Sequence, residues 1–140
     1  MSGSGSAIAR RPKVFVLDSE ALSLAVRGDR TMTKRLDLAH ENDIEVVASP
    51  MTLIEAFDSR AIEKRWDWAL SRVDVPPLDK DQAREARRLL AIAGLHGHKY
   101  AIDAVVAVVA RRQRGDVTVF TSDMDDFCQL LPDHIVIQKV

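Results

Sequence analysis

The segment KVFVLD, from Lys13 to Asp18, decides the fold. Its four central residues, Val14 to Leu17, are apolar and do not alternate with polar residues, which is typical of a strand buried on both faces of a parallel sheet. Asp18 follows this strand directly. Ligands of open α/β sheets bind beyond the carboxyl ends of the strands, so Asp18 is the first candidate functional residue.

Strand patterns alternate with helical patterns along the rest of the chain. Short apolar runs predict further strands at residues 44–48, 73–75, 117–120 and 135–137. Helical patterns lie at residues 20–26, 31–39, from 50 onward, 60–70, 79–93, 100–114 and 127–131. This alternation predicts an α/β fold, with one domain built on a central, mainly parallel sheet of four to five strands flanked by helices.

Residues 100–114, YAIDAVVAVVARRQR, contain enough valine to favour a strand by propensity alone. The length of the segment, its basic last turn and Gly115 as a C-terminal stop favour a helix instead. The preceding segment, LHGHK at residues 95–99, is expected to be a loop.

The composition is that of one ordinary globular domain, with 140 residues, 46% apolar and 29% charged. The net charge of −1 excludes attraction of the whole molecule to nucleic acid, so any such attraction must come from local clusters. The single cysteine, Cys128, excludes an internal disulfide and is expected to be a small core residue.

No run approaches the ~18 apolar residues of a membrane span, so we expect a soluble, cytoplasmic protein. Residues 1–12 lack the apolar core of a secretory signal and are expected to be a flexible lead-in to a domain at 13–140.

Four carboxylates stand at positions where strands end or helices begin. Asp18 also suits the simpler role of a helix N-cap, and Glu55 suits an exposed helix surface. Asp103 interrupts the apolar run AIDAVVAVVA, where a buried carboxylate needs a partner, although capping its own helix or pairing with Lys99 remains open. Asp123 repeats the position of Asp18 after the strand at residues 117–120.

These acids are expected to meet at one edge of the sheet. Parallel strands end at the same edge, which brings Asp18 and Asp123 together, and Glu55 and Asp103 are predicted in the first turns of their helices. Crowded carboxylates repel one another, and Mg²⁺ or Mn²⁺ is the cation that such oxygen ligands bind. A site of this kind is suited to hydrolysis of a phosphodiester by water.

Four segments, in this order, resemble the motifs of the PIN-domain ribonucleases and, within them, the VapC-type toxins of toxin–antitoxin pairs. They are VLDSEAL, SPMTLIEAF, YAIDAVVAVVA and VFTSDMDDF, which span the chain from about Val14 to its C-terminal segment. The resemblance implies a single PIN domain. It also implies that the catalytic acids are Asp18, Glu55, Asp103 and Asp123, and that the first, third and fourth of these bind the metal.

The resemblance further implies supporting roles for Asp126 and for the hydroxyl of Thr121 or Ser122. Glu20 departs from the pattern as an additional acid, which either strengthens metal binding or points away.

The activity implied is a Mg²⁺- or Mn²⁺-dependent endoribonuclease that acts on structured RNA such as tRNA or rRNA. The implied partners are a second copy of the chain and a VapB-type antitoxin, with contacts expected in residues 51–70.

Two basic clusters are candidates for contacts with RNA phosphates. The alternative is that they form solvated helix surfaces and compensate the charge at a helix end. The clusters contain Arg84, Arg87, Arg88, Arg111 and Arg112.

Three other functions are alternatives. A catalytically degenerate PIN fold would bind RNA or protein without cleaving. A phosphatase of the haloacid-dehalogenase type requires a second Asp two residues after the first, and this chain has Glu20 at that position. A phospho-signalling receiver requires an acceptor Asp at a mid-chain strand end, which residues 47–49 and 73–76 do not supply.

Overall fold

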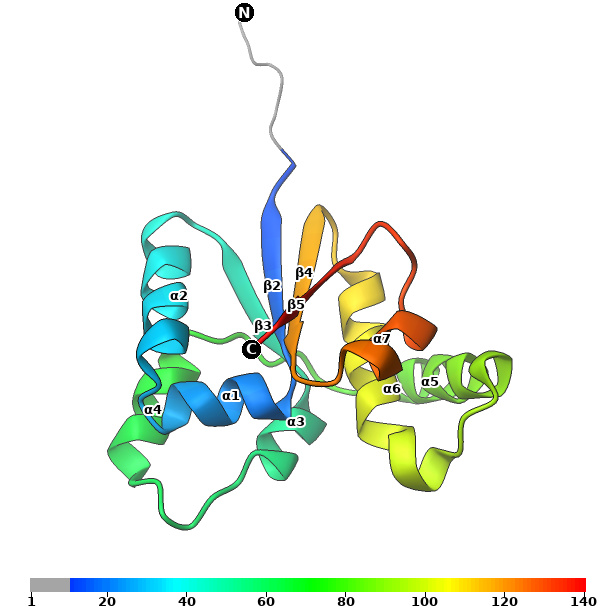
Figure 1. Cartoon of the computed structure of the whole chain (residues 1–140), viewed down its shortest axis with the longest axis horizontal. Helices are drawn as coiled ribbons and strands as arrows, with labels where there is room; N and C mark the ends of the chain where they lie inside the picture. The colour runs from blue at the N-terminus through cyan, green and yellow to red at the C-terminus, as the bar shows by residue number, and fades with distance from the viewer. Residues whose placement is uncertain (1–10) are drawn as a thin grey trace, which may run out of the picture.

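The protein is described here by a computed structural model that covers residues 11–140, so residues 1–10 of the expected lead-in lie outside the described residues. Its centre is a sheet of four parallel strands in the order β3-β2-β4-β5 (Figure 1). The strands are β2 (Lys13–Leu17), β3 (Glu45–Ala48), β4 (Asp116–Thr121) and β5 (Val136–Lys139). The predicted single α/β domain with a parallel sheet is therefore confirmed.

Seven helices of the described chain flank this sheet. They are α1 (Ser19–Val26), α2 (Arg30–Glu41), α3 (Pro50–Glu55), α4 (Glu63–Ser71), α5 (Lys80–Ala93), α6 (Gly97–Arg112) and α7 (Met124–Leu130). Helices α1, α2 and α4 lie on one side of the sheet, and α5, α6 and α7 lie on the other (Figure 1). None of the described helices is both long enough and apolar enough to cross a membrane.

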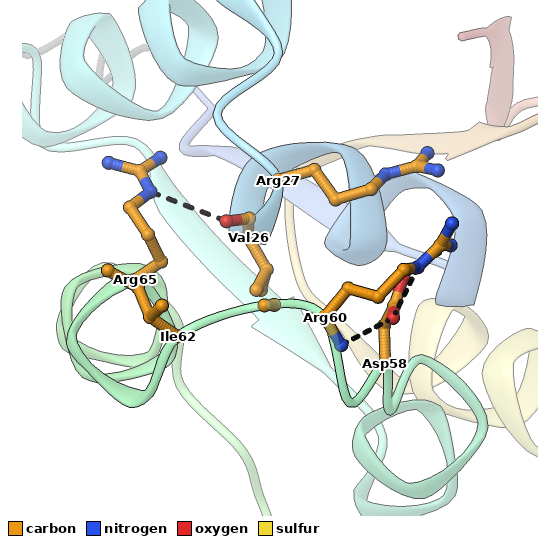
Figure 2. Close-up of a pocket in the computed structure, with 7 residues that line it drawn as sticks. Val26, Arg27, Asp58, Arg60, Ile62 and Arg65 are labelled. Carbon is orange, nitrogen blue, oxygen red and sulfur yellow. Dashed lines mark hydrogen bonds and ion pairs between the residues drawn. The ribbon is translucent and has the colours of Figure 1, made fainter.

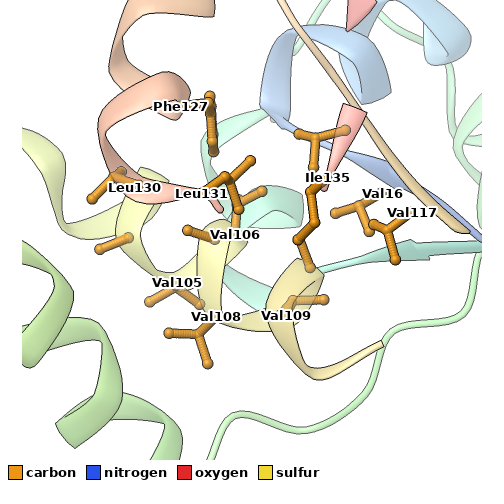
Figure 3. Close-up of a cluster of buried hydrophobic side chains, with 14 of the residues drawn as sticks. Val16, Val105, Val106, Val108, Val109, Val117, Phe127, Leu130, Leu131 and Ile135 are labelled. Carbon is orange, nitrogen blue, oxygen red and sulfur yellow. The ribbon is translucent and has the colours of Figure 1, made fainter. Parts of the chain in front are cut away.

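The central strand β2 divides the core into two apolar clusters. Val14 and Val16 pack into the cluster on the α5–α7 side, which Figure 3 shows, and Phe15 and Leu17 pack into the cluster around α1 and α2. Successive side chains of a strand point to opposite faces, so both faces of β2 must be covered. This explains why KVFVLD has an unbroken apolar run.

Helix α6 forms as predicted, but its bounds differ from those expected. It begins at Gly97, within the expected loop, so Asp103 lies in the second turn and not the first. It ends at Arg112, and the C-cap residue Gln113 is extended, so Gly115 is not the helix stop. The segment from Ala104 to Ala110 is buried throughout, as the apolar run predicted.

Three further expectations are wrong in detail. The helix predicted at residues 60–70 begins only at Glu63, because the side chain of Asp58 accepts hydrogen bonds from the backbone and guanidinium of Arg60 and forms a local turn. The strand at residues 73–75 is reduced to a single bridge between Val47 and Asp74, since the two prolines that follow offer no N–H for further pairing.

Cys128 is exposed and is not a core residue. Helix α7 buries Phe127 and Leu130, which are three residues apart on one face. Cys128 therefore projects from another side of the helix.

The order of the strands creates a switch point beside β2. The chain passes from β2 to β3 on one side, and later returns to β4 on the other side of β2. In open α/β sheets, the crevice for ligands opens at such a point, outside the carboxyl ends of the strands. Here that crevice lies between the ends of β2 and β4.

We predict that Gly115→Ala will destabilise the protein more than Gly94→Ala. Both glycines have positive φ, 104° and 68°, and either substitution adds backbone strain of about 1–2 kcal/mol. A Cβ at position 115 would also meet the carbonyl oxygen of Pro12 at 2.1 Å, whereas a Cβ at position 94 would meet nothing within 4 Å. Urea denaturation of both variants measures the difference, and equal losses would contradict the close approach of Pro12.

Candidate functional site

Asp18 closes the end of β2 and caps α1. Its carboxylate accepts a hydrogen bond from the backbone N–H of Ala21 at 2.9 Å, and its own N–H donates to the carbonyl of Phe120 in β4 at 3.1 Å. Only 4% of the residue is exposed. The predicted cap is therefore present, and it fixes this carboxylate at the switch point.

Burial raises the pKa of Asp18 above its usual value. The Thr121 hydroxyl and the Ala21 N–H lower this pKa, and the charges of Asp123 and Glu20 raise it further. Asp18 thus interacts electrostatically with Asp123, which follows the other central strand.

The end of β4 turns sharply toward α7. Thr121 is fully buried, and its hydroxyl oxygen accepts a hydrogen bond from the N–H of Asp123 at 2.9 Å. Asp123 is the N-cap residue of α7, yet its side chain makes no capping hydrogen bond. The turn therefore leaves the Asp123 carboxylate available for other ligands.

Three carboxylates come together where α6 passes the start of α7. Asp103, Asp123 and Asp126 each offer an oxygen atom, and these atoms lie within 4.8 Å of one another. Asp103 and Asp126 are partly buried and Asp123 is exposed. The group has the ligand type and spacing to hold a metal ion.

The pKa of Asp103 is raised by burial and by neighbouring carboxylates. Burial, followed by the charges of other acids, raises the pKa of Asp103 from 3.8 to about 7. The contributing acids, in decreasing order, are Asp123, Asp126, Glu55 and Asp18. Carboxylates from four distant parts of the chain therefore lie close enough to act on one group.

Neither of the simpler roles considered for Asp103 is present. The N-cap of α6 is His96, so Asp103 lies too far along the helix to cap it. The ammonium of Lys99 lies 5.1 Å from the centre of the Tyr100 ring, and Asp103 has no ion pair within the described part of the chain.

Glu55 is exposed and is the last residue of α3, not in its first turn as predicted, because this helix has only six residues. Its carboxylate accepts a hydrogen bond from the hydroxyl of Ser19 at 2.5 Å. Ser19 is the first residue of α1, so this bond holds the end of α3 beside Asp18. Sequence reasoning missed Ser19, although its position directly after Asp18 was the available signal.

Glu20 is directed away from the three clustered acids. Its carboxylate forms an ion pair with Arg27 at 3.3 Å, seven residues further along the chain. Its charge still raises the pKa of Asp18. Glu20 therefore affects Asp18 through its negative charge alone and is not part of the cluster of Asp103, Asp123 and Asp126.

A cavity of about 410 Å³ opens beside the acids at the start of α7. Its lining is mostly polar, and the single cation is Lys139 at the end of β5, a residue that sequence reasoning also missed. The lining residues are Ser122, Asp123, Met124, Asp125, Asp126 and Lys139.

The predicted basic clusters lie away from the acids. Arg111 and Arg112 are exposed near the end of α6, about 12–14 Å along the helix axis from Asp103. Arg112 forms an ion pair with Glu85 of α5 at 3.4 Å. The remaining members of the clusters are exposed on α5: Arg84, Arg87 and Arg88.

A second cavity of about 410 Å³ lies at the far end of α1 and is lined partly by arginines (Figure 2). The guanidinium of Arg65 donates to the carbonyl oxygens of Ala25 at 2.8 Å and Val26 at 3.3 Å. Arg60 is paired with Asp58 at 2.8 Å. Both guanidiniums therefore have partners within the protein.

Neither the models of known protein families nor the curated proteins give a match to this chain. Among solved structures, the chain is similar to one from the VapBC2 complex of Rickettsia felis, bound to a DNA fragment from its promoter. The match has a TM-score of 0.65 and 14% sequence identity, and it covers 91% of this chain and 98% of that one. At this identity, the similarity is one of fold.

We predict that Asp103→Asn will stabilise the metal-free protein at pH 8 and will leave its stability nearly unchanged at pH 4. The folded protein binds the Asp103 proton more tightly than the unfolded chain does, because its pKa is about 7 when folded and near 3.8 when unfolded. The contribution of Asp103 to stability is therefore fully present below pH 4 and is lost as the pH rises through 7. Urea denaturation in chelator at both pH values measures this, with the exposed Asp67→Asn as control, and parallel pH profiles for wild type and Asp103→Asn would contradict it.

Proposed function

We propose that this protein is a Mg²⁺- or Mn²⁺-dependent endoribonuclease of the PIN type that acts as a VapC-type toxin. The observation that carries the proposal is the crowding of carboxylates around Asp103 at the switch point of the sheet. Folding brings these like charges together at a cost, and a divalent cation offsets that cost. The fold similarity to a chain of a VapBC complex supports this assignment.

The donor set favours a hard cation. All the candidate ligands are carboxylate oxygens, which suit Mg²⁺ and Mn²⁺ better than softer metals. In this proposal Asp103, Asp123 and Asp126 hold the ion, and Asp18 contributes from the β2 side, directly or through water. A bound ion of this kind would lower the pKa of a water molecule and offset charge on the phosphodiester.

The protein residues then orient the reactants. Glu55 is more exposed than Asp18, so we place it on the substrate side, where it accepts a hydrogen bond from the attacking water. Ser19 holds Glu55 in this position through its hydroxyl. Thr121 supports Asp123 through the hydrogen bond that shapes the turn, and the Ser122 hydroxyl lies on the wall of the cavity.

The proposed substrate is structured RNA such as tRNA or rRNA. The open cavity beside the acids has room for a nucleotide backbone and is not enclosed around a small molecule. The arginines at the end of α6 and on α5 lie far enough from the acids that only an extended substrate would reach both. Their contacts would contribute affinity that depends on salt.

The proposed protein partners are a VapB-type antitoxin and a second copy of the chain. The segment from α3 to α4 exposes three large apolar side chains, Ile54 (69% exposed), Phe57 (71%) and Ile62 (63%). Neighbouring apolar groups of this kind commonly mark a protein contact. They fall within the residues 51–70 in which such contacts are expected.

The second candidate is a PIN fold without catalysis, which would bind RNA or protein only. A fold that only binds does not require carboxylates close enough to shift one another's pKa. The raised pKa of Asp103 therefore favours the nuclease. The next experiment separates the two.

We predict that the purified protein cleaves structured RNA when Mg²⁺ or Mn²⁺ is present and that a chelator stops cleavage. Asp103→Asn should reduce the rate by at least about 100-fold, since changing even an outer-shell partner of a metal ligand costs 10–100-fold. The fold should survive, as judged by circular dichroism and urea denaturation.

Asp67→Asn is the matched control, because Asp67 is exposed on α4 away from the cluster and should leave the rate unchanged. Equal rates of cleavage by the wild type and by Asp103→Asn would contradict the proposed mechanism. Metal-independent RNA binding without any cleavage would support the degenerate fold instead.

We also predict that a short reading frame immediately upstream of the gene encodes the antitoxin. Co-expression should give a stable complex in which RNA cleavage is inhibited, and Phe57→Ser should weaken that complex without reducing the cleavage rate of the isolated protein. Pull-down and cleavage assays measure both effects, with the exposed Ile92→Ser on α5 as control.

A further inference from the structure

We propose that Lys139 binds a backbone phosphate of the substrate RNA, in a subsite beside the carboxylates, and that it does so only after a divalent cation is bound. This inference rests on the proposed nuclease function and adds a residue and an order of binding to it. The cavity beside α7 and the position of Lys139 in the sheet carry the argument.

The sheet itself determines the position of Lys139. It is the last residue of β5 and is paired in register with Thr121, the last residue of β4. The strands are parallel, so Lys139 stands at the same edge of the sheet as the acids that follow β2 and β4. Val140 donates a backbone hydrogen bond to the carbonyl of Thr121 at 3.1 Å, which holds this end of β5 in place.

The composition of the cavity leaves the ammonium of Lys139 free to bind a ligand. Lys139 is the only cation among its six lining residues, and three of the others are aspartates, Asp123, Asp125 and Asp126. Lys139 nevertheless forms no ion pair with any residue that the structure describes. Lys139 is exposed and lines the cavity, so an incoming phosphate would meet its side chain there.

The charges explain the order of binding. Without a metal, the three aspartates of the cavity and Asp103 outnumber the single ammonium and repel a phosphate. A divalent cation on Asp103, Asp123 and Asp126 removes two negative charges from this balance. Lys139 then faces a much smaller excess of negative charge, so the repulsion of an anion is weaker and its ammonium can act as a point charge on the phosphate.

Lys139 has a simpler alternative role, which is to offset the charge of the acids in the metal-free protein. In that case its removal would tighten metal binding, because a competing cation is lost, and would not change RNA affinity. The two roles therefore predict different outcomes for the same variant.

The test compares wild type with Lys139→Gln, Lys139→Arg and the control Lys34→Gln, which removes an exposed lysine on α2. The RNA is a structured transcript that the wild type cleaves, and binding is measured with Ca²⁺ in place of Mg²⁺ to prevent turnover. We expect Lys139→Gln to weaken RNA binding about 3- to 10-fold in Ca²⁺ and to have no effect on binding in chelator. The slope of log Kd against log salt concentration should fall by about 0.7–0.9, as for the loss of one phosphate contact.

Lys139→Arg should retain most of the affinity, because it retains the charge. In cleavage assays, Lys139→Gln should raise KM more than it lowers kcat, with Mn²⁺ affinity unchanged or higher. Wild-type RNA affinity in Lys139→Gln would overturn the inference, and so would an equal loss of affinity with and without Ca²⁺. Failure of the wild type itself to bind or cleave RNA would instead overturn the proposed function.

Discussion

The repulsion among the carboxylates at the switch point is the constraint on which the rest of the site depends. Asp103 experiences the charge of four other acids, and nothing about those acids alone would hold them together. The protein holds them with contacts that do not involve their charges. Helix α6 is anchored by its buried segment from Ala104 to Ala110, and Asp123 is held through the buried hydroxyl of Thr121. The stability of the core thus compensates for an arrangement that is unfavourable in itself, as is common at functional sites.

The sequence predicts the parts of this arrangement that follow from the sheet. The unbroken apolar run in KVFVLD predicts a strand that is covered on both faces, and the two clusters on either side of β2 confirm it. Since parallel strands end at one edge, the proximity of Asp18 and Asp123 follows without further information. Ser49 could likewise be identified as a helix cap, because it directly precedes Pro50 and a helical pattern, and its side chain accepts a hydrogen bond from the N–H of Met51.

The sequence does not predict what depends on helix ends and side-chain direction. Gly97 and His98 resemble a loop locally, yet the first turn of α6 forms there and continues into the segment that is buried from Ala104 to Ala110. Asp126 joins Asp103 and Asp123 only because α7 begins immediately after the turn, a matter of one residue in the bounds of a helix. Lys139 carries no local signal at all, since its place beside the acids follows from the register of β5 against β4.

The distribution of the acids along the chain also constrains when the cluster exists. Asp18, Glu55 and Asp103 are all synthesised before Asp123 and Asp126, which lie within the last eighteen residues of the sequence. The complete cluster therefore exists only when β4 has paired with β2 and α7 has packed against α6. A partly folded chain in which β4 and α7 are detached has no complete cluster of acids. The repulsion among them then opposes the docking of β4 and α7 and leaves the packing of β2, β3 and α1 unaffected.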